Sequence, residues 1–121
     1  MRGWLACAGV NGFIAVMMGA VAAHMLQGRI TPHGSELIET AARYQMSHAL
    51  ALFGVAWLAT AKSGIAAHAA GIAFVIGCVL FSGCLYGLAL TDNNVFALPI
   101  PIGGVAFMLG WTAVAASAIK R

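Results

Sequence analysis

The chain alternates long apolar runs with short polar turns, and each run is long enough to cross a lipid bilayer. In the first run, residues 3–26, the only strongly polar side chains are Asn11 and His24. A helix rises about 1.5 Å per residue, so this run spans roughly 36 Å, more than the thickness of a hydrocarbon core. Three more runs follow, at residues 43–61, 66–90 and 102–119. The pattern predicts a single all-α domain, an integral membrane four-helix bundle.

The composition excludes a water-soluble domain. Hydrophobic residues make up 62% of the chain and charged residues 7%, whereas a soluble domain carries about 25% charged residues. The formal net charge of +3 comes from basic residues dispersed among the apolar runs. They form no basic stripe of the kind that binds nucleic acid. The exterior is therefore expected to face lipid.

The basic residues also predict the orientation of the chain. One side of the four-span arrangement holds four basic residues and no acid: Arg2, Lys62, Lys120 and Arg121. The other side holds two basic and three acidic residues: Arg29, Arg43, Glu36, Glu39 and Asp92. Because basic residues concentrate on the cytoplasmic side, both termini are expected to be cytoplasmic. A cleaved signal peptide is the competing interpretation of the first run, but its stripe of small residues favours an uncleaved span.

The most polar segment, residues 27–39, is expected to be a surface loop that leads into a helix. Thr31 before Pro32, or Ser35 before Glu36, has the chemistry of a helix start. Apolar residues then recur at three- and four-residue steps. We expect an amphipathic helix at about residues 35–45, which either lies on the membrane surface or continues into the second span.

Small residues repeat at helical spacing in three of the spans. Helices in a membrane associate where small side chains let their backbones approach. The glycines expected to form such contacts are Gly12, Gly19, Gly83, Gly87, Gly103 and Gly110. The stripes in the first and fourth spans predict that these two spans pack against each other. A composition so rich in alanine and glycine also produces such stripes by chance.

Polar side chains gather where the second span begins. With alternating spans, seven of them are expected in the outer half of the bilayer: His24, Arg43, Tyr44, Gln45, His48, Ser82 and Tyr86. Polar groups at such depth need partners, so a structural set of hydrogen bonds between helices is the favoured interpretation. His48 is expected at its centre, bonded to Tyr86 or to a partner near His24. Asn11 also needs an internal partner.

Two ligand-binding alternatives remain open for this polar cluster. His24 and His48 on neighbouring helices could ligate a b-type haem. Tyr44, His48 and Tyr86 could instead donate hydrogen bonds to a quinone or a lipid headgroup. The structural interpretation needs no cofactor and no metal.

The sequence offers little support for catalysis. The three cysteines, Cys7, Cys78 and Cys84, lie inside apolar runs without the CxxC spacing of metal or redox sites. No Ser-His-Asp order, HExxH motif or phosphate-binding glycine loop is present. All three acids lie in the loops. We therefore expect that the protein is not an enzyme.

Five blocks of the chain resemble the YgdD-like family of small bacterial inner-membrane proteins, a domain-of-unknown-function family (DUF423). The blocks are residues 19–24, 42–52, 81–86, 101–104 and 110–111. The resemblance extends over nearly all of the chain, and the blocks occur in the family's order. Two residues depart from the family's pattern: Ala22 stands in place of glycine, and Cys84 stands in place of serine. The resemblance implies a four-span protein of the bacterial inner membrane and no established activity.

These observations favour a structural role. The chain is expected to act as a scaffold or accessory subunit through helix contacts with a membrane protein partner, with itself and with lipids. A membrane cofactor-binding accessory protein for haem, quinone or lipid is the alternative.

Overall fold

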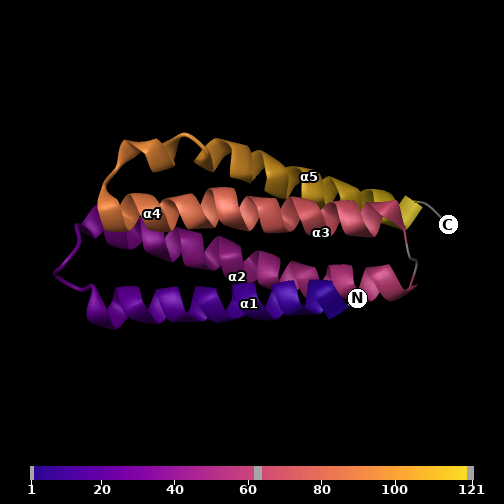
Figure 1. Ribbon diagram of the computed structural model, residues 1–121, viewed down its shortest axis with the longest axis horizontal. Coiled ribbons are helices and arrows are strands. Elements are labelled where there is room, and N and C mark those ends of the chain that lie inside the picture. The colour runs from indigo at the N-terminus through magenta and orange to yellow at the C-terminus, as the bar shows by residue number, and fades with distance from the viewer. Residues whose placement is uncertain (1, 62–63, 120–121) are drawn as a thin grey trace.

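The computed structural model describes residues 2–61 and 64–119, and within these ranges every regular element is a helix (Figure 1). In chain order the elements are α1 (Arg2–Ala20), the π-helix η1 (Val21–Met25), α2 (Pro32–Ala61), α3 (Ile65–Gly77), the π-helix η2 (Cys78–Gly83), α4 (Cys84–Thr91), the 3-10 helix η3 (Asn94–Ala97) and α5 (Ile100–Ile119). Elements α3, η2 and α4 follow one another without a break and form one rod. The basic residues Lys62, Lys120 and Arg121, which entered the orientation argument, lie outside the described residues.

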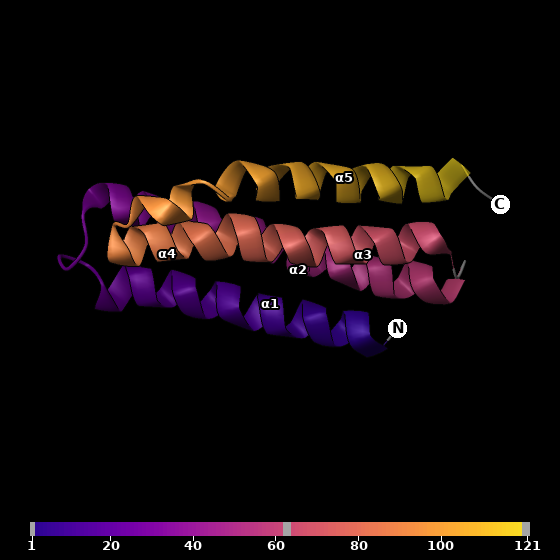
Figure 2. The same ribbon diagram turned by 45° about the horizontal axis from the view of Figure 1, so that its top comes forward.

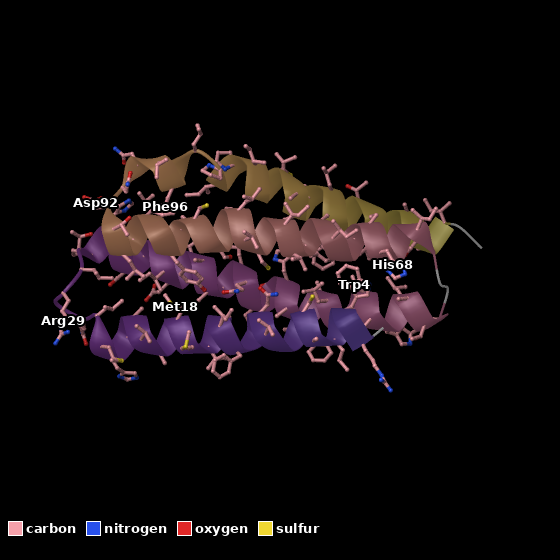
Figure 3. The ribbon with its side chains drawn as sticks, viewed as in Figure 1. Trp4, Met18, Arg29, His68, Asp92 and Phe96 are labelled. Atoms are coloured by element: carbon pink, nitrogen blue, oxygen red, sulfur yellow. The ribbon has the colours of Figure 1, made fainter. Side chains whose placement is uncertain are left out.

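The four long helices lie side by side, with α1 and α5 on opposite sides of the pair formed by α2 and the α3–α4 rod (Figures 1 and 2). Helix α1 packs against α2, and α5 packs against α3 and η2. Both chain ends lie at one end of the molecule, and the loop after η1 and the loop before α5 lie at the other. Figure 3 shows Trp4 and His68 near the first end and Arg29 and Asp92 at the second.

This arrangement contradicts the expected contact between the first and fourth spans. A Cβ at Gly12 would meet Ala49 of α2 at 3.9 Å, and a Cβ at Gly110 would meet the ring of Phe74 in α3. Both glycines face inward as expected, but toward different neighbours. The stripes identified the buried face of each helix and carried no information about which helix covers it.

Helix α2 is longer than the second apolar run. It begins at Pro32, where the hydroxyl of Thr31 accepts a hydrogen bond of 2.9 Å from the backbone N–H of Gly34. Proline suits a first helical turn and the threonine oxygen caps it. No residue between them and the apolar run breaks the helix, so the amphipathic segment at residues 35–45 is the first part of α2.

Three helical stretches are long and apolar enough to cross a membrane: Arg2–Met25, Ile65–Thr91 and Asn94–Ile119. Helix α2 has 30 residues but is less apolar, because Tyr44, Gln45, Ser47 and His48 interrupt its hydrophobic run. Two of these four, Gln45 and His48, are buried inside the protein at 5% exposure. Some of the polar side chains of α2 therefore face the interior of the bundle.

Glycines bring α5 against the α3–α4 rod. A Cβ at Gly103 would meet the backbone nitrogen of Phe81, which cannot rotate away, so a larger side chain here would force α5 away from η2. A Cβ at Gly77 would meet the ring of Phe107, and one at Gly87 would meet the ring of Phe96 in η3, so these rings would have to shift.

Two of the six predicted packing glycines make no such contact. A Cβ at Gly19 would meet nothing within 4 Å, and one at Gly83 only the carbonyl of Cys78 in its own helix, at 3.7 Å. The contact face of α1 is formed instead by three alanines at heptad spacing, Ala8, Ala15 and Ala22, which are 1%, 3% and 7% exposed. Among the described residues, no neighbouring helix lies within 4 Å of a Cβ at Gly19 or Gly83.

Candidate functional site: a polar layer in the middle of the bundle

A polar layer separates two apolar clusters along the length of the bundle. One cluster contains Leu52, Phe74 and Phe107, and the other contains Ile38 and Leu85. The layer takes members from all four long helices: Asn11, Gln45, His48, Ser82, Tyr86 and Trp111. It is the main group of interior polar side chains among the described residues, and we treat it as the candidate site.

Helix α2 contributes the two central members through its heptad pattern. Ala41, Gln45, His48, Leu52 and Val55 follow steps of four and three residues, and all are buried. Residues at these steps lie on one face of a helix. The sequence of α2 thus directs an amide and an imidazole into the interior at positions that would ordinarily be apolar.

A relay of three hydrogen bonds connects α4, α2 and α1 through Gln45. The hydroxyl of Tyr86 donates to Gln45 Oε1 at 2.8 Å, and Gln45 Nε2 donates to Asn11 Oδ1 at 2.9 Å. Asn11 Nδ2 then donates to the backbone carbonyl of Cys7 at 2.9 Å. An unpaired amide in an apolar interior costs several kcal/mol. The expectation that Asn11 has an internal partner is confirmed.

His48 connects α2 to α5. Its Nδ1 lies 2.7 Å from the carbonyl oxygen of Tyr44, and Trp111 Nε1–H donates to its Nε2 at 3.0 Å. A carbonyl only accepts and an indole N–H only donates, so the neutral tautomer with its proton on Nδ1 satisfies both contacts. The expected partners, Tyr86 or a group near His24, were wrong: Gln45 engages Tyr86, and His24 is distant.

Aromatic rings surround His48. Its imidazole stacks on Phe107 with ring centroids 3.7 Å apart and an interplanar angle of 10°. Tyr44, one turn away on α2, packs on Phe81 at 4.8 Å, and Trp111 packs on Phe74 at 5.0 Å. These rings fill the space where α2, the rod and α5 meet.

The π-helix η2 brings the rod into this layer. The hydroxyl of Ser82 is fully buried and donates to the carbonyl of Ala41 in α2 at 2.8 Å. The neighbouring Phe81 contacts Tyr44, and its backbone lies against Gly103. A π segment widens one turn of a helix and occurs frequently at functional sites. Here the widened turn faces both α2 and α5.

The predicted cluster is divided by the structure. Gln45, His48, Ser82 and Tyr86 are buried and bonded, whereas His24 and Arg43 are exposed and Tyr44 is 42% exposed. Gln45 and His48 lie near the middle of α2. The reason is the early start of α2 at Pro32, which moves Gln45 and His48 toward its centre.

The haem alternative does not fit this geometry. The bond between Asn11 and Gln45 sets the antiparallel register of α1 and α2, and it separates His24 from His48 by roughly 24 Å along the helices. Both nitrogens of His48 are already engaged. No group of three His, Cys, Asp or Glu side chains that could hold a metal ion occurs among the described residues.

The sequence analysis missed Trp111 and a second tryptophan–histidine pair. Trp4 Nε1–H donates to His68 Nδ1 at 3.0 Å and connects α1 to α3 at the end where the termini lie (Figure 3). Each indole N–H needs an acceptor when its ring packs inside a protein. That rule signals the need for a partner but does not identify it.

Comparison with known proteins identifies the family. The model of the family described as "Protein of unknown function (DUF423)" matches residues 18–104. The UPF0382 membrane protein YwdK of Bacillus subtilis is 39% identical over 121 residues, covering 99% of this chain and 98% of the relative. The UPF0382 inner membrane protein YgdD of Escherichia coli K12 is 36% identical over 119 residues, covering 98% and 91%. No solved structure gives a significant match.

The chain therefore belongs to the DUF423 family, as the five sequence blocks indicated. Relatives named as inner membrane proteins and three membrane-length helices make it a multi-pass protein of the bacterial inner membrane.

Proposed function

We propose that this protein is a four-span scaffold or accessory subunit of the inner membrane, and not an enzyme. It acts through contacts of its outer helix faces with a membrane protein partner or with a second copy, in a lipid environment. It has no role in nucleic acid binding. Both termini are cytoplasmic.

The full internal pairing of the polar layer is the observation that carries this proposal. Every buried side-chain nitrogen and oxygen in the described part of the chain has a hydrogen-bond partner. Side chains that are bonded to each other across helices hold the bundle together. The layer is thus best explained as structural, and the activity is assigned to the outward faces.

A fourth membrane span at α2 follows from the same pairing. Hydropathy counts Gln45 and His48 as if they faced lipid, but both are buried and bonded to other helices. The 30 residues of α2 exceed the roughly 20 that a span requires. Four spans bring both chain ends to the same side, and the basic residues favour the cytoplasmic side.

Two broad apolar faces point away from each other and suit contacts with separate neighbours. On α1, Val10, Phe13 and Val16 are 58%, 70% and 62% exposed. On α5, Met108 and Leu109 are 63% and 60% exposed. Because α1 and α5 lie on opposite sides of the central pair (Figures 1 and 2), a partner on one face leaves the other free.

Site-specific photocrosslinking in growing cells tests this role. A photoreactive residue at Phe13 or Met108 should give discrete protein adducts, because those side chains are 70% and 63% exposed and point outward. Ile76 on α3, 44% exposed, is the comparison position. Adducts of a single mass at Phe13 or Met108 would support the scaffold, with a doubled mass identifying a second copy. Lipid adducts alone at all three positions would overturn it.

A further inference from the structure

Two hollows follow each other along the side of the molecule where α2 and α5 face each other. The first has a volume of about 340 Å³, and its walls include Tyr44, His48, Phe107 and Trp111. The second has a volume of about 400 Å³ and lies between Gly54, Trp57 and Leu58 of α2 and residues 114–118 of α5. The two helices run in the same direction (Figure 1), so the second hollow continues the first toward their C-terminal ends.

The first hollow has flat aromatic walls and one free hydrogen-bond donor. His48 and Trp111 satisfy each other, whereas the hydroxyl of Tyr44 has no partner within the described part of the chain, and its ring is 42% exposed. None of the lining side chains is Lys, Arg, Asp or Glu. A group that binds here is therefore flat and neutral, and it accepts a hydrogen bond.

The second hollow offers apolar surface and almost nothing else. Its one hydroxyl, on Ser117, is bonded to the carbonyl of Val114 in its own helix at 2.6 Å. Gly54 leaves space on the α2 wall, since a Cβ there would meet nothing within 4 Å. A hydrocarbon chain fits such a mostly apolar surface.

We propose that this seam binds a prenylated quinone. Its ring lies in the first hollow and accepts a hydrogen bond from Tyr44, and its tail lies along the second. A phospholipid fits less well, because its charged headgroup would have to enter a hollow whose walls carry no cation. Arg43, the nearest cation in sequence, is exposed and does not line the hollow.

The intrinsic fluorescence of Trp111 reports the binding of a quinone in the first hollow. The chain has three tryptophans, and Trp4→Phe with Trp57→Phe leaves only the one in the first hollow. This protein, in nanodiscs of neutral phospholipid, is titrated with a benzoquinone that carries a decyl tail. Quinones quench indole fluorescence on contact, so a saturable decrease is expected.

Three variants locate the ligand. Tyr44→Phe removes the donor and should weaken binding about five- to tenfold. Gly104→Leu should abolish saturable quenching, because it fills the first hollow from a position where a Cβ makes only an ordinary contact of 3.9 Å with Phe81. Gly54→Leu should weaken the decyl quinone but not a tail-free one. Gly9→Leu, an equally open position on α1, is the matched control and should bind as the parent does.

Quenching that rises linearly and equally in all variants would mean partition into the bilayer only and would overturn the proposal. Saturable quenching that Tyr44→Phe and Gly104→Leu leave unchanged would also overturn it. So would a phospholipid that co-purifies with the parent, is lost in Gly54→Leu and is not displaced by the quinone. Of the two crosslinking positions, Met108 lines the first hollow, whereas Phe13 lies on α1, away from the seam. Adducts at Phe13 therefore test the scaffold role independently of the quinone, so either proposal can fail alone.

Discussion

Gln45 is the residue on which the interior most depends, because its amide is both a donor and an acceptor and both functions are used. Glutamate would lack the donor toward Asn11, and leucine would lack both groups. The position lies in a helix face that is otherwise apolar, so its polarity is explained only by the partners on α1 and α4.

Replacing Gln45 with leucine should lower the free energy of unfolding by about 1–3 kcal/mol, since Asn11 Oδ1 and the Tyr86 hydroxyl lose their partner. Denaturation of the purified protein in mixed micelles with a rising fraction of sodium dodecyl sulfate measures this change. Ser47→Ala is the control, because that exposed hydroxyl bonds only to its own helix at Arg43. Equal stability of both variants would contradict the relay.

The His48 contacts predict one tautomer. Nitrogen NMR of imidazole-labelled protein at neutral pH should show a protonated Nδ1 and an unprotonated Nε2. Trp111→Phe keeps a ring against Phe74 but removes the donor, so the Nε2 resonance should shift while Nδ1–H stays on the Tyr44 carbonyl. A proton on Nε2 in the parent protein would refute the assigned bond with Trp111.

For single residues, the sequence shows which side chains need a hydrogen-bond partner but does not identify that partner. Asn11 stands alone in an apolar run, so its requirement for a hydrogen bond follows from the residue itself. That Gln45 meets it, or that Trp111 meets His48, depends on which helices are neighbours. His24 was grouped with His48 only because each is near the edge of an apolar run.

At the scale of elements, glycines on the small-residue stripes of different helices differ in what they contact. Gly103 lies against the backbone of Phe81, which cannot rotate away, whereas Gly19 has open space beside it. Apolar periodicity places both on a small-residue stripe. The contact that separates them is set by the neighbouring helix.

Gly103→Ala should therefore destabilise the protein by about 1–3 kcal/mol, since α5 must move away from η2 to admit a methyl group. Gly19→Ala should leave stability unchanged or raise it by up to about 1 kcal/mol, because alanine favours the helix. Micelle denaturation of the two variants in parallel gives the comparison. A loss at Gly19 equal to that at Gly103 would show that the stripe packs along its whole length.

Two features of the elements could not be read from the sequence. The π-helix η2 differs from an α-helix by one hydrogen-bond step and is favoured by contacts with α2 and α5, which are distant in sequence. Pro32, where α2 begins, was one of the two helix starts expected from the sequence. The amphipathic segment and the apolar run differ in hydropathy, so the sequence does not show that they form one helix.

For the whole molecule, the position of the chain ends predicts the outcome of topology reporters. A fusion at the C-terminus and one inserted after Ala61 should both report the cytoplasm, because the start of α1, the end of α2 and the end of α5 lie together (Figure 1). Insertions after Gly28 and after Asn93 should report the opposite side. The same signal after Gly28 and after Ala61 would mean that α2 does not span.

The number and length of the helices follow from the sequence, while their order around the bundle does not. Each apolar run is read from its own residues. The positions of α1 and α5 on opposite sides of the bundle result instead from contacts between pairs of helices. The alanines of α1 pack on α2, and the glycines of α5 pack on the α3–α4 rod.

The relay through Gln45 has a consequence for how the protein is made. Synthesis proceeds from the N-terminus, so when α2 leaves the ribosome the one partner already in the bilayer is Asn11 on α1. Tyr86 and Trp111, which complete the bonding of Gln45 and His48, are translated later. If α2 is the proposed fourth span, we expect it to enter the membrane together with α1, the helix made just before it. The α1–α2 hairpin would then be the first insertion unit, and α5 would reach His48 last.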